Sequence, residues 1–398
     1  MARLKEIVGK AISGEWGLDD EAGTGIPVLR TTNFTNEGII NFSDVVTRTI
    51  NKKDLLQKYL RPGDIIIEKS GGSDKQPVGR VVYYDGAPDT YLFNNFTGVL
   101  RIINPAQWNS KYLFYALYAN YLRGGTRKYQ NKTTGLHNLK TDQYVEEFEV
   151  DEISLSEQYH VATILDKLRE LISLRKQQLA KLDELVKARF VEMFGDPTSN
   201  PMGWNASTLK SVTSKIGSGA TPKGGKESYQ VEGITLIRSM NVHDGRFEYK
   251  DLAHINDSQA EQLSNVEVYK NDVFINITGA SVARSCIVPD DVLPARVNQH
   301  VSIVRCKQSF FRPIFANQQF LNTSFKKLLL ELGEAGGATR QAITKQQLED
   351  LIVVVPPLNL QEEFSVFVAH VGQQKLTIQQ SLDKLEVLRR SLMQEYFG

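Results

Sequence analysis

The sequence predicts an α+β protein in which two tandem globular modules alternate with two long helices. Two observations carry this prediction. Residues 1 to about 195 align with residues from about 204 to 398 at an offset that stays between 203 and 208. Each half also ends in a stretch of about 40 residues whose apolar side chains have coiled-coil spacing. A repeat of this length can hold a complete domain, whereas solenoid units run to some tens of residues and must stack.

The repeat keeps framework and polar residues alike. The clearest matches are Leu4-Lys5 with Leu209-Lys210, Ser13-Gly14 with Ser218-Gly219, Gly25 to Asn33 with Gly233 to Asn241, Gly63-Asp64 with Asn271-Asp272, Arg101 with Arg305, and Phe194-Gly195 with Phe397-Gly398. Because most other positions differ, we expect one scaffold that carries two separate binding surfaces. Duplication followed by drift, without a division of labour, is the alternative.

Each module is expected to be α+β. Strands are predicted at 26–32, 64–68, 79–84 and 98–103 in the first module and at 234–239, 272–277 and 301–305 in the second, because these apolar runs are bounded by Gly, Asp, Asn and Pro. Helices are predicted near 110–122 and 313–332. The domain boundaries follow as a first module at 1–153, a spacer helix at 154–195, a linker at 196–203, a second module at 204–355 and a C-terminal spacer helix at 356–398.

The two long helices carry matching apolar stripes. The first stripe comprises Val161, Ile164, Leu168, Leu171, Leu179, Leu182, Val186, Phe190 and Met193, and the second comprises Phe364, Phe367, Val371, Ile378, Leu382, Leu385, Leu392 and Tyr396. Ser154 with Glu157 and Asn359 with Glu362 have the spacing of N-terminal capping boxes. A helix of about 39 residues is about 58 Å long, more than a module's own core needs. We therefore expect the helices to pair as an antiparallel coiled coil with approximate two-fold symmetry. Two separate helices, each packed on its own module, are the alternative.

Composition excludes several classes of protein. No run approaches the ~20 apolar residues of a membrane span, and residues 1–10 lack the apolar stretch of a secretory signal. We therefore expect a cytoplasmic protein. Cys286 and Cys306 both lie in the second half, which excludes a repeated disulfide framework or Cys-based zinc site. Because the net charge is only +1, any DNA binding must depend on local groups of basic residues.

Three groups of polar residues are candidates for such binding. Arg and Asn follow an apolar strand in both halves and could reach phosphates or base edges, although an internal ion pair explains the Arg equally well. Gly-rich loops at 69–75 and 278–284 would let backbone N–H groups approach phosphates, although hairpin turns explain them as well. A mobile basic loop is predicted at 122–140 and is matched by 336–341 with Lys345. The candidate DNA-binding residues are Arg30, Asn33, Lys69, Ser70, Lys75, Arg80, Arg123, Arg127, Lys128, Lys132, Thr134 and His137 in the first module and Arg238, Asn241, Thr278, Arg284, Thr339, Arg340 and Lys345 in the second.

Catalytic motifs do not occur in the sequence. It contains no G-x-x-x-x-G-K-[ST] loop, G-x-G-x-x-G turn, G-x-S-x-G elbow or H-E-x-x-H helix. The six histidines have no metal-ligand spacing, and no acidic pair recurs in both halves. We therefore assign no catalytic, cofactor-binding or metal-binding residue, and expect a protein that binds rather than reacts.

These features together resemble the specificity (S) subunit of type I restriction-modification enzymes. The resemblance covers the whole chain and depends on the strand ends Leu29 to Asn33 and Ile237 to Asn241, the Asp before the next strand, and the helices that end at Gly195 and Gly398. It implies two target recognition domains that each read one half of a bipartite, gapped DNA site, with the paired helices setting the gap.

The resemblance also implies partners. Two modification (methyltransferase) subunits would dock on the helices, and restriction subunits would add translocation and cleavage. S-adenosylmethionine, ATP and Mg are then expected on the partner subunits and not on this chain, which would be a non-catalytic subunit that binds double-stranded DNA and no membrane. Two other hypotheses stay open at this point: a coiled-coil adaptor that joins two protein-binding modules, and a DNA-modifying enzyme with an unrecognised active site.

Overall fold

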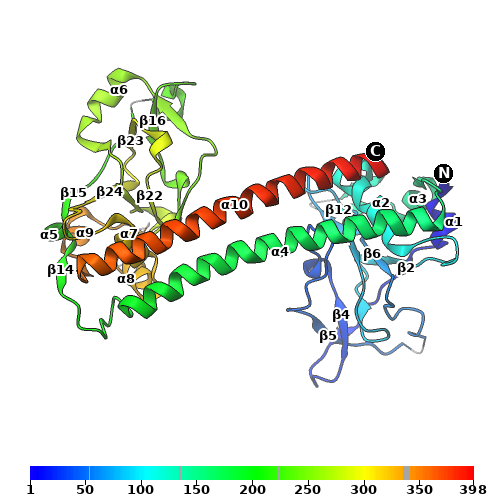
Figure 1. Cartoon of the computed structure of the whole chain (residues 1–398). Helices are drawn as coiled ribbons and strands as arrows, with labels where there is room; N and C mark the ends of the chain where they lie inside the picture. Colours follow the sequence, from blue (N-terminus) through cyan, green and yellow to red (C-terminus); the bar gives the residue numbers. More distant parts are fainter. Residues whose placement is uncertain (53, 134–135, 223, 335–340) are drawn as a thin grey trace. The chain divides into compact units, whose positions relative to one another are not determined.

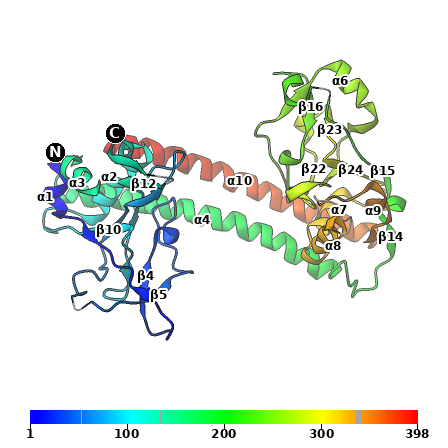
Figure 2. The same cartoon turned by 180° about the vertical axis from the view of Figure 1, so that it is seen from behind.

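The computed structural model describes the whole chain except residues 53, 134–135, 223 and 335–340. The chain divides into two units, of which unit 1 contains Met1–Arg175 and Ser381–Gly398 and unit 2 contains Lys176–Gln380. Helix α4 (Leu155–Phe194) begins in unit 1 and ends in unit 2, and helix α10 (Leu358–Phe397) runs the other way. Figures 1 and 2 show the elements of each unit from opposite sides.

Unit 1 is built on a central antiparallel sheet of order β2-β10-β6-β8. A second sheet, β3-β5-β4-β9, contains the parallel pair β4–β9, and a third has the order β11-β12-β7. The strands are β1 (Ala2–Arg3), β2 (Ile12–Ser13), β3 (Leu18–Asp19), β4 (Ile26–Leu29), β5 (Val46–Thr49), β6 (Ile65–Glu68), β7 (Ser70–Gly72), β8 (Val81–Tyr83), β9 (Leu92–Phe93), β10 (Thr97–Leu100), β11 (Gln130–Thr133), β12 (Leu136–Leu139) and β13 (Glu149–Val150). The shorter helical elements are α1 (Leu4–Val8), η1 (Thr31–Asn33), α2 (Ser110–Leu122), η2 (Gly125–Tyr129) and α3 (Thr141–Glu147).

Both faces of the central sheet are covered. Ile65 and Ile67 of β6 point into the core that α2 closes, whereas Ile66 packs on the opposite face with residues of β4 and β9. Because successive side chains of a strand alternate between faces, a strand buried on both sides is apolar at every position. This explains the uninterrupted Ile65-Ile66-Ile67 run that the sequence shows.

Unit 2 has the same arrangement. Its central sheet has the order β15-β24-β21-β22, a second sheet has the order β19-β16-β23-β20 with the parallel pair β16–β23, and α7 packs on β21, β22 and β24. Val273 and Ile275 of β21 face one core and Phe274 faces the other. The strands are β14 (Ala206–Thr208), β15 (Thr213–Ser218), β16 (Ile234–Ile237), β17 (Val242–His243), β18 (Arg246–Phe247), β19 (Ala253–Ile255), β20 (Glu267–Val268), β21 (Val273–Asn276), β22 (Ser285–Ile287), β23 (Ala295–Val297), β24 (Val301–Cys306) and β25 (Ile352–Val354). The helical elements are α5 (Leu209–Val212), η3 (Gly225–Ser228), η4 (Ser239–Asn241), α6 (Asp257–Gln262), η5 (Ser264–Val266), η6 (Gly279–Ser281), η7 (Asp290–Val292), α7 (Pro313–Leu321), α8 (Thr323–Glu334) and α9 (Lys345–Asp350).

The two long helices meet within each unit. In unit 1, Val161 and Leu165 of α4 share a core with Met393 and Phe397 of α10. In unit 2, Phe190 and Phe194 of α4 contact both Phe315 of α7 and Phe364 of α10, with ring centroids 4.8 to 5.6 Å apart. Ion pairs join Arg189 to Glu363 at 3.0 Å and Asp183 to Lys375 at 2.5 Å, so the helices are antiparallel within unit 2.

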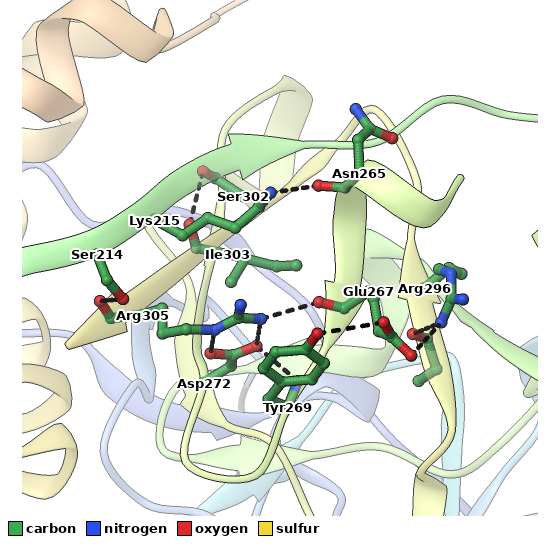
Figure 3. Close-up of polar contacts among 11 residues, drawn as sticks. Ser214, Lys215, Asn265, Glu267, Tyr269, Asp272, Arg296, Ser302, Ile303 and Arg305 are labelled. Carbon is green, nitrogen blue, oxygen red and sulfur yellow. Dashed lines mark hydrogen bonds and ion pairs between the residues drawn. The ribbon is translucent and has the colours of Figure 1, made fainter. Parts of the chain in front are cut away.

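An equivalent ion pair fixes the strand pairing in each unit. The guanidinium of Arg305 donates two hydrogen bonds of 2.8 Å to the buried carboxylate of Asp272 (Figure 3), joining β24 to the residue before β21. Arg101 makes the same paired contact with Asp64 at 2.7 Å. Two parallel, charge-assisted bonds fix both distance and orientation, which explains why this Arg and Asp recur in the aligned halves.

A buried glutamine attaches each long helix to its unit. Gln158 accepts a hydrogen bond from the backbone N–H of Asn109 and donates to the carbonyls of Gln107 and Ile153. At the start of α10, Gln361 makes the equivalent contacts, which are with Arg312, Phe310 and Pro356. Both glutamines are at most 1% exposed.

The structure confirms much of the predicted secondary structure and corrects four details. The helix 110–122 and the Ser154–Glu157 capping box are confirmed. The predicted 313–332 helix is interrupted at Asn322, whose side chain accepts from the N–H of Ser324 and starts α8. The Asn359 capping box is wrong because α10 already begins at Leu358. Leu171 is 44% exposed, and Ile172 takes the buried position instead. Within 122–140, predicted as a mobile loop, the described residues form η2 and the antiparallel pair β11–β12, because β12 completes backbone pairing with β7.

Candidate nucleic-acid interface

The strand-end asparagines have a structural role. Asn33 is 2% exposed; its carboxamide accepts from the N–H of Arg30 and donates to the carbonyls of Asn41 and Asp44 at 3.0 and 2.8 Å. Asn241 is fully buried and accepts from the N–H of Arg238 in the same way. Each closes a one-turn helix and satisfies backbone groups that burial would leave unpaired. The DNA contacts predicted for Asn33 and Asn241 stay predictions, and the structural role explains why both residues recur in the aligned halves.

The neighbouring arginines are engaged internally. Arg30 forms an ion pair with Asp44 at 3.3 Å, and Arg238 donates to the carbonyl of Asp251 and lies over the ring of Tyr229. The alternative that the sequence left open, an internal contact for this Arg, describes both.

Arg80 and Arg284 stand at equivalent positions, because the carbonyl of each accepts a 2.9 Å bond from the last residue of the adjacent strand, Glu68 or Asn276. Arg80 donates 2.9 Å bonds to the carbonyls of Thr31 and Phe34 and lies 3.4 Å from Glu68, so it belongs to the interior. Its predicted DNA contact stays a prediction, and its guanidinium is already engaged within the unit.

The second unit satisfies the corresponding carbonyls differently. The carboxamide of Asn276 donates to the carbonyls of Ser239 and Val242 at 2.9 and 3.4 Å. Arg284 is thereby released, and its half-buried side chain makes no hydrogen bond or ion pair with the residues that the structure describes. Of the two aligned arginines, Arg284 is the one available to a ligand.

Basic residues of unit 1 border two recesses. Lys75, Arg123 and Arg127 line a surface recess of about 540 Å³, and Arg127 donates to the carbonyl of Asp74 at 3.4 Å. Lys128 lies 4.8 Å over the ring of Tyr129 at a neighbouring recess. These exposed cations suit phosphate contacts.

His137 does not join them. It is 9% exposed, and its ring nitrogens face Gln130 at 3.1 Å and Asp74 at 3.5 Å. Gln130 of β11 and Asp74 of the adjacent loop thus hold the ring inside, and the DNA contact of His137 stays a prediction. The side chain of Lys132 and residue Thr134 lie outside the described part of the chain.

A larger recess, of about 640 Å³, gathers Lys10, Lys69, Ser70 and Lys140 with the exposed ring of Phe96. Burial lowers the pKa of Lys69, and its ammonium donates to the hydroxyl of Ser13 at 3.4 Å. The predicted residues Lys69 and Ser70 thus meet here. Lys10 and Phe96 were missed by sequence reasoning, although Lys10 lies just before the aligned Ser-Gly pair.

In unit 2, Thr278 is hydrogen-bonded to the Nδ1 atom of His300. Lys345 is exposed and forms an ion pair with Glu349 at 3.5 Å. Thr339 and Arg340 lie outside the described residues. No three His, Cys, Asp or Glu side chains of the described residues group as a metal site, and no described helix is long and apolar enough to cross a membrane.

Comparison with known proteins agrees with this picture of a recognition scaffold. Residues 1–184 match the family of type I restriction modification DNA specificity domains. This match indicates a DNA specificity domain of the type I restriction-modification class in the first 184 residues.

Its relatives are distant in sequence. The chain is 21% identical over 373 residues to the putative type I restriction enzyme MjaX specificity subunit of Methanocaldococcus jannaschii, covering 90% of this chain and 83% of that protein. It superposes on the S subunit of a type I restriction-modification system from M. genitalium with a TM-score of 0.59 at 14% identity, covering 100% and 95% of the two chains. A chain from a structure of a type I R-M system, solved to study complex assembly and conformational transition, gives a TM-score of 0.56 at 17% identity over 100% and 96%. These two likenesses establish the fold.

Proposed function

We propose that each module reads one half of a bipartite, gapped DNA site and that the two long helices set the gap. The recognition modules would comprise residues 1–153 and 204–355, the spacer helices residues 154–195 and 356–398, and the linker residues 196–203. The observation that carries this proposal is the shared framework. Both units have the same central strand order, the same Arg–Asp pair and the same buried glutamine at the start of a long helix.

A shared framework with different surfaces suits two readers of different base sequences. Two readers held at a fixed separation bind one molecule of DNA with an affinity that neither reaches alone, because the second contact is intramolecular. They also reject sites with the wrong gap. We propose that the helices pair as an antiparallel coiled coil related by approximate two-fold symmetry, and the contacts seen in unit 2 between Arg189 and Glu363 and between Asp183 and Lys375 support this.

The remaining parts of the reaction would come from partner subunits. We propose that two modification subunits dock on the helices and supply S-adenosylmethionine chemistry, and that restriction subunits supply ATP- and Mg-dependent translocation and cleavage. The DNA-binding residues would be those that the structure leaves accessible, above all Lys75, Arg123, Arg127, Lys128 and Arg284. The assembly would act in the cytoplasm, where the DNA is.

The test is a genome-wide map of methylated adenine in cells that express the modification partner with or without this chain. We expect a split, gapped motif that appears only with the chain. No chain-dependent motif, with the partner shown to be expressed and active, would contradict the proposal and favour the protein-binding adaptor.

A further inference from the structure

The two units hold one short turn in the same way. The turn joins β9 to β10 in unit 1, at residues 94–96, and β23 to β24 in unit 2, at residues 298–300. At its first residue, the N–H of Asn94 donates to the carbonyl of Leu29 at 2.9 Å, and the N–H of Asn298 donates to the carbonyl of Ile237 at 3.0 Å. Both asparagines are buried.

The last residue of the turn is fixed as well. The carbonyl of Phe96 accepts a 2.7 Å bond from the N–H of Lys69, and the carbonyl of His300 accepts a 3.0 Å bond from the N–H of Ile277. The carbonyl of Lys69 in turn accepts a 2.8 Å bond from the N–H of Leu139 in β12, and the carbonyl of Ile277 accepts a 2.8 Å bond from the N–H of Ile343, just before α9. The turn is therefore tied to two neighbouring segments in each unit.

The recurring Ser-Gly pair completes this frame. A Cβ atom on Gly14 would overlap the carbonyl oxygen of Asn94, and one on Gly219 would overlap that of Val297. Only glycine lets the chain pass this close to the turn. The two glycines therefore recur in the aligned halves because each lets the chain pass close to the turn. A binding role is not needed to explain them.

The side chains displayed on the frame differ. Unit 1 exposes Asn95 and Phe96, whose ring is 50% exposed, and unit 2 exposes Gln299 with His300 half-buried beside it. Around the first pair lie the three lysines of the 640 Å³ recess, with Asp142 as the one acidic side chain among the described residues of its wall. Around the second pair lies a neutral chain of hydrogen bonds that runs from Thr221 through Gln299 and His300 to Thr278.

We propose that these two turns determine base specificity, with Asn95 and Phe96 contacting base edges of one half-site and Gln299 and His300 those of the other. The inference rests on the proposed function and assigns its specificity-determining residues. A carboxamide can bond the N6 and N7 edge of adenine with two hydrogen bonds, and an aromatic ring can contact the methyl group of thymine. The hydrogen-bonded frame of the turn holds the two exposed side chains in a fixed position, and their identity can differ between the units. Each unit can then contact different bases from the same place in the fold. The lysines beside the first turn would contact the phosphates that flank its bases.

The experiment compares methylation motifs from the full chain, its modification partner and three variants. Gln299→Ala removes one reading group, and the double variant Gln299→Asn with His300→Phe gives unit 2 the exposed pair of unit 1. Gln262→Ala, at an exposed glutamine of α6 away from the turn, is the matched control. Each variant is first shown to retain the thermal unfolding midpoint of the wild-type chain.

We expect Gln299→Ala to relax one or two base positions within a single half-site, with discrimination at those positions reduced about tenfold or more. The double variant should change the preferred base there, while the other half-site, the gap and the control stay unchanged. Unaltered motifs for both turn variants would overturn the inference and leave the proposed function in place. Absence of any motif with the wild-type chain would instead remove the proposed function. If methylation with a variant is too weak to map, competition binding with DNA duplexes substituted at each position measures the base preference instead. The same outcomes then support or overturn the inference.

Discussion

The guanidinium of Arg305 lies 3.9 Å from the ring centroid of Tyr269 while it binds the carboxylate of Asp272 (Figure 3). The backbone N–H of Tyr269 also donates to Asp272 at 2.8 Å. The ring, the carboxylate and the guanidinium thus form one cluster directly before β21. The carboxylate is fully buried and accepts three hydrogen bonds.

Asp272→Asn should destabilise unit 2 by about 3 kcal/mol, because it leaves the partly buried charge of Arg305 without its counter-ion. Denaturant unfolding followed by circular dichroism measures the change. The matched control is Asp290→Asn, whose pair with Lys270 is exposed on both sides and contributes about 1 kcal/mol or less. Equal effects of the two substitutions would refute the structural role of the buried pair.

Arg284→Ala should weaken DNA binding without loss of stability, because this guanidinium has no partner among the described residues. The salt dependence of binding should also fall by about one unit of slope, as expected when a single phosphate contact is lost. Arg80→Ala, at the aligned position, should instead lower the unfolding midpoint, since two buried carbonyls lose their donor. Binding titrations at several salt concentrations, with melting curves for both variants, test this contrast, and the reverse pattern would contradict it.

Removing seven residues from the exposed middle of both α4 and α10 should shorten the gap in the recognised site. Seven residues preserve the heptad phase and correspond to about 10 Å of helix, or about three base pairs at 3.4 Å per step. The bases read in each half-site should not change. Removal of four residues, which breaks the phase, is the control and should impair folding or assembly. A methylation motif whose gap is unaltered by the seven-residue deletion would exclude the spacer role.

Glu15 provides a test of pH dependence. Hydrogen bonds from Lys52 and Lys58 lower the pKa of its carboxyl below the usual value of 4.5. A carboxyl with a lowered folded-state pKa contributes stability above its unfolded pKa and loses it as the pH falls through the folded value. Glu15→Gln should therefore destabilise the chain at pH 7, by about 1 kcal/mol or less because the side chain of Lys52 is largely exposed to solvent. The difference should shrink as the pH falls below 4.5 and disappear below the lowered pKa of Glu15; a constant difference across this range would show that charge is not its cause.

Periodicity made the helices predictable from the sequence. The segment 110–122 is a helix with the expected limits, and the long helix α4 begins within one residue of the expected start. The strand cores were also recoverable, because β6 and β21 are apolar at each of their first three positions. Helices and strands can be predicted in this way because their buried positions recur at a regular spacing along the chain.

The polar residues were less predictable, because a sequence shows where they occur but not which backbone groups need them. Asn33 and Asn241 looked like ligands at strand ends, yet the turn that follows has buried N–H and carbonyl groups that only these side chains reach. Arg80 and Arg284 align perfectly well with each other, and their different roles depend on whether Glu68 or Asn276 stands on the next strand. The sequence alone does not show which residue of the neighbouring strand lies beside each arginine. That relationship follows from the strand register in the structure.

The position of Phe397 has a consequence for synthesis. Its ring lies 5.3 Å from that of Tyr112 and belongs, with Met393, to the core beneath the first central sheet. During translation the chain emerges from its amino end, so the part of the core made first stays open until Met393 and Phe397 have been synthesised. A truncation before Met393 would therefore damage the earliest-made module, and the newly made chain must keep that apolar surface from aggregating until α10 has been synthesised.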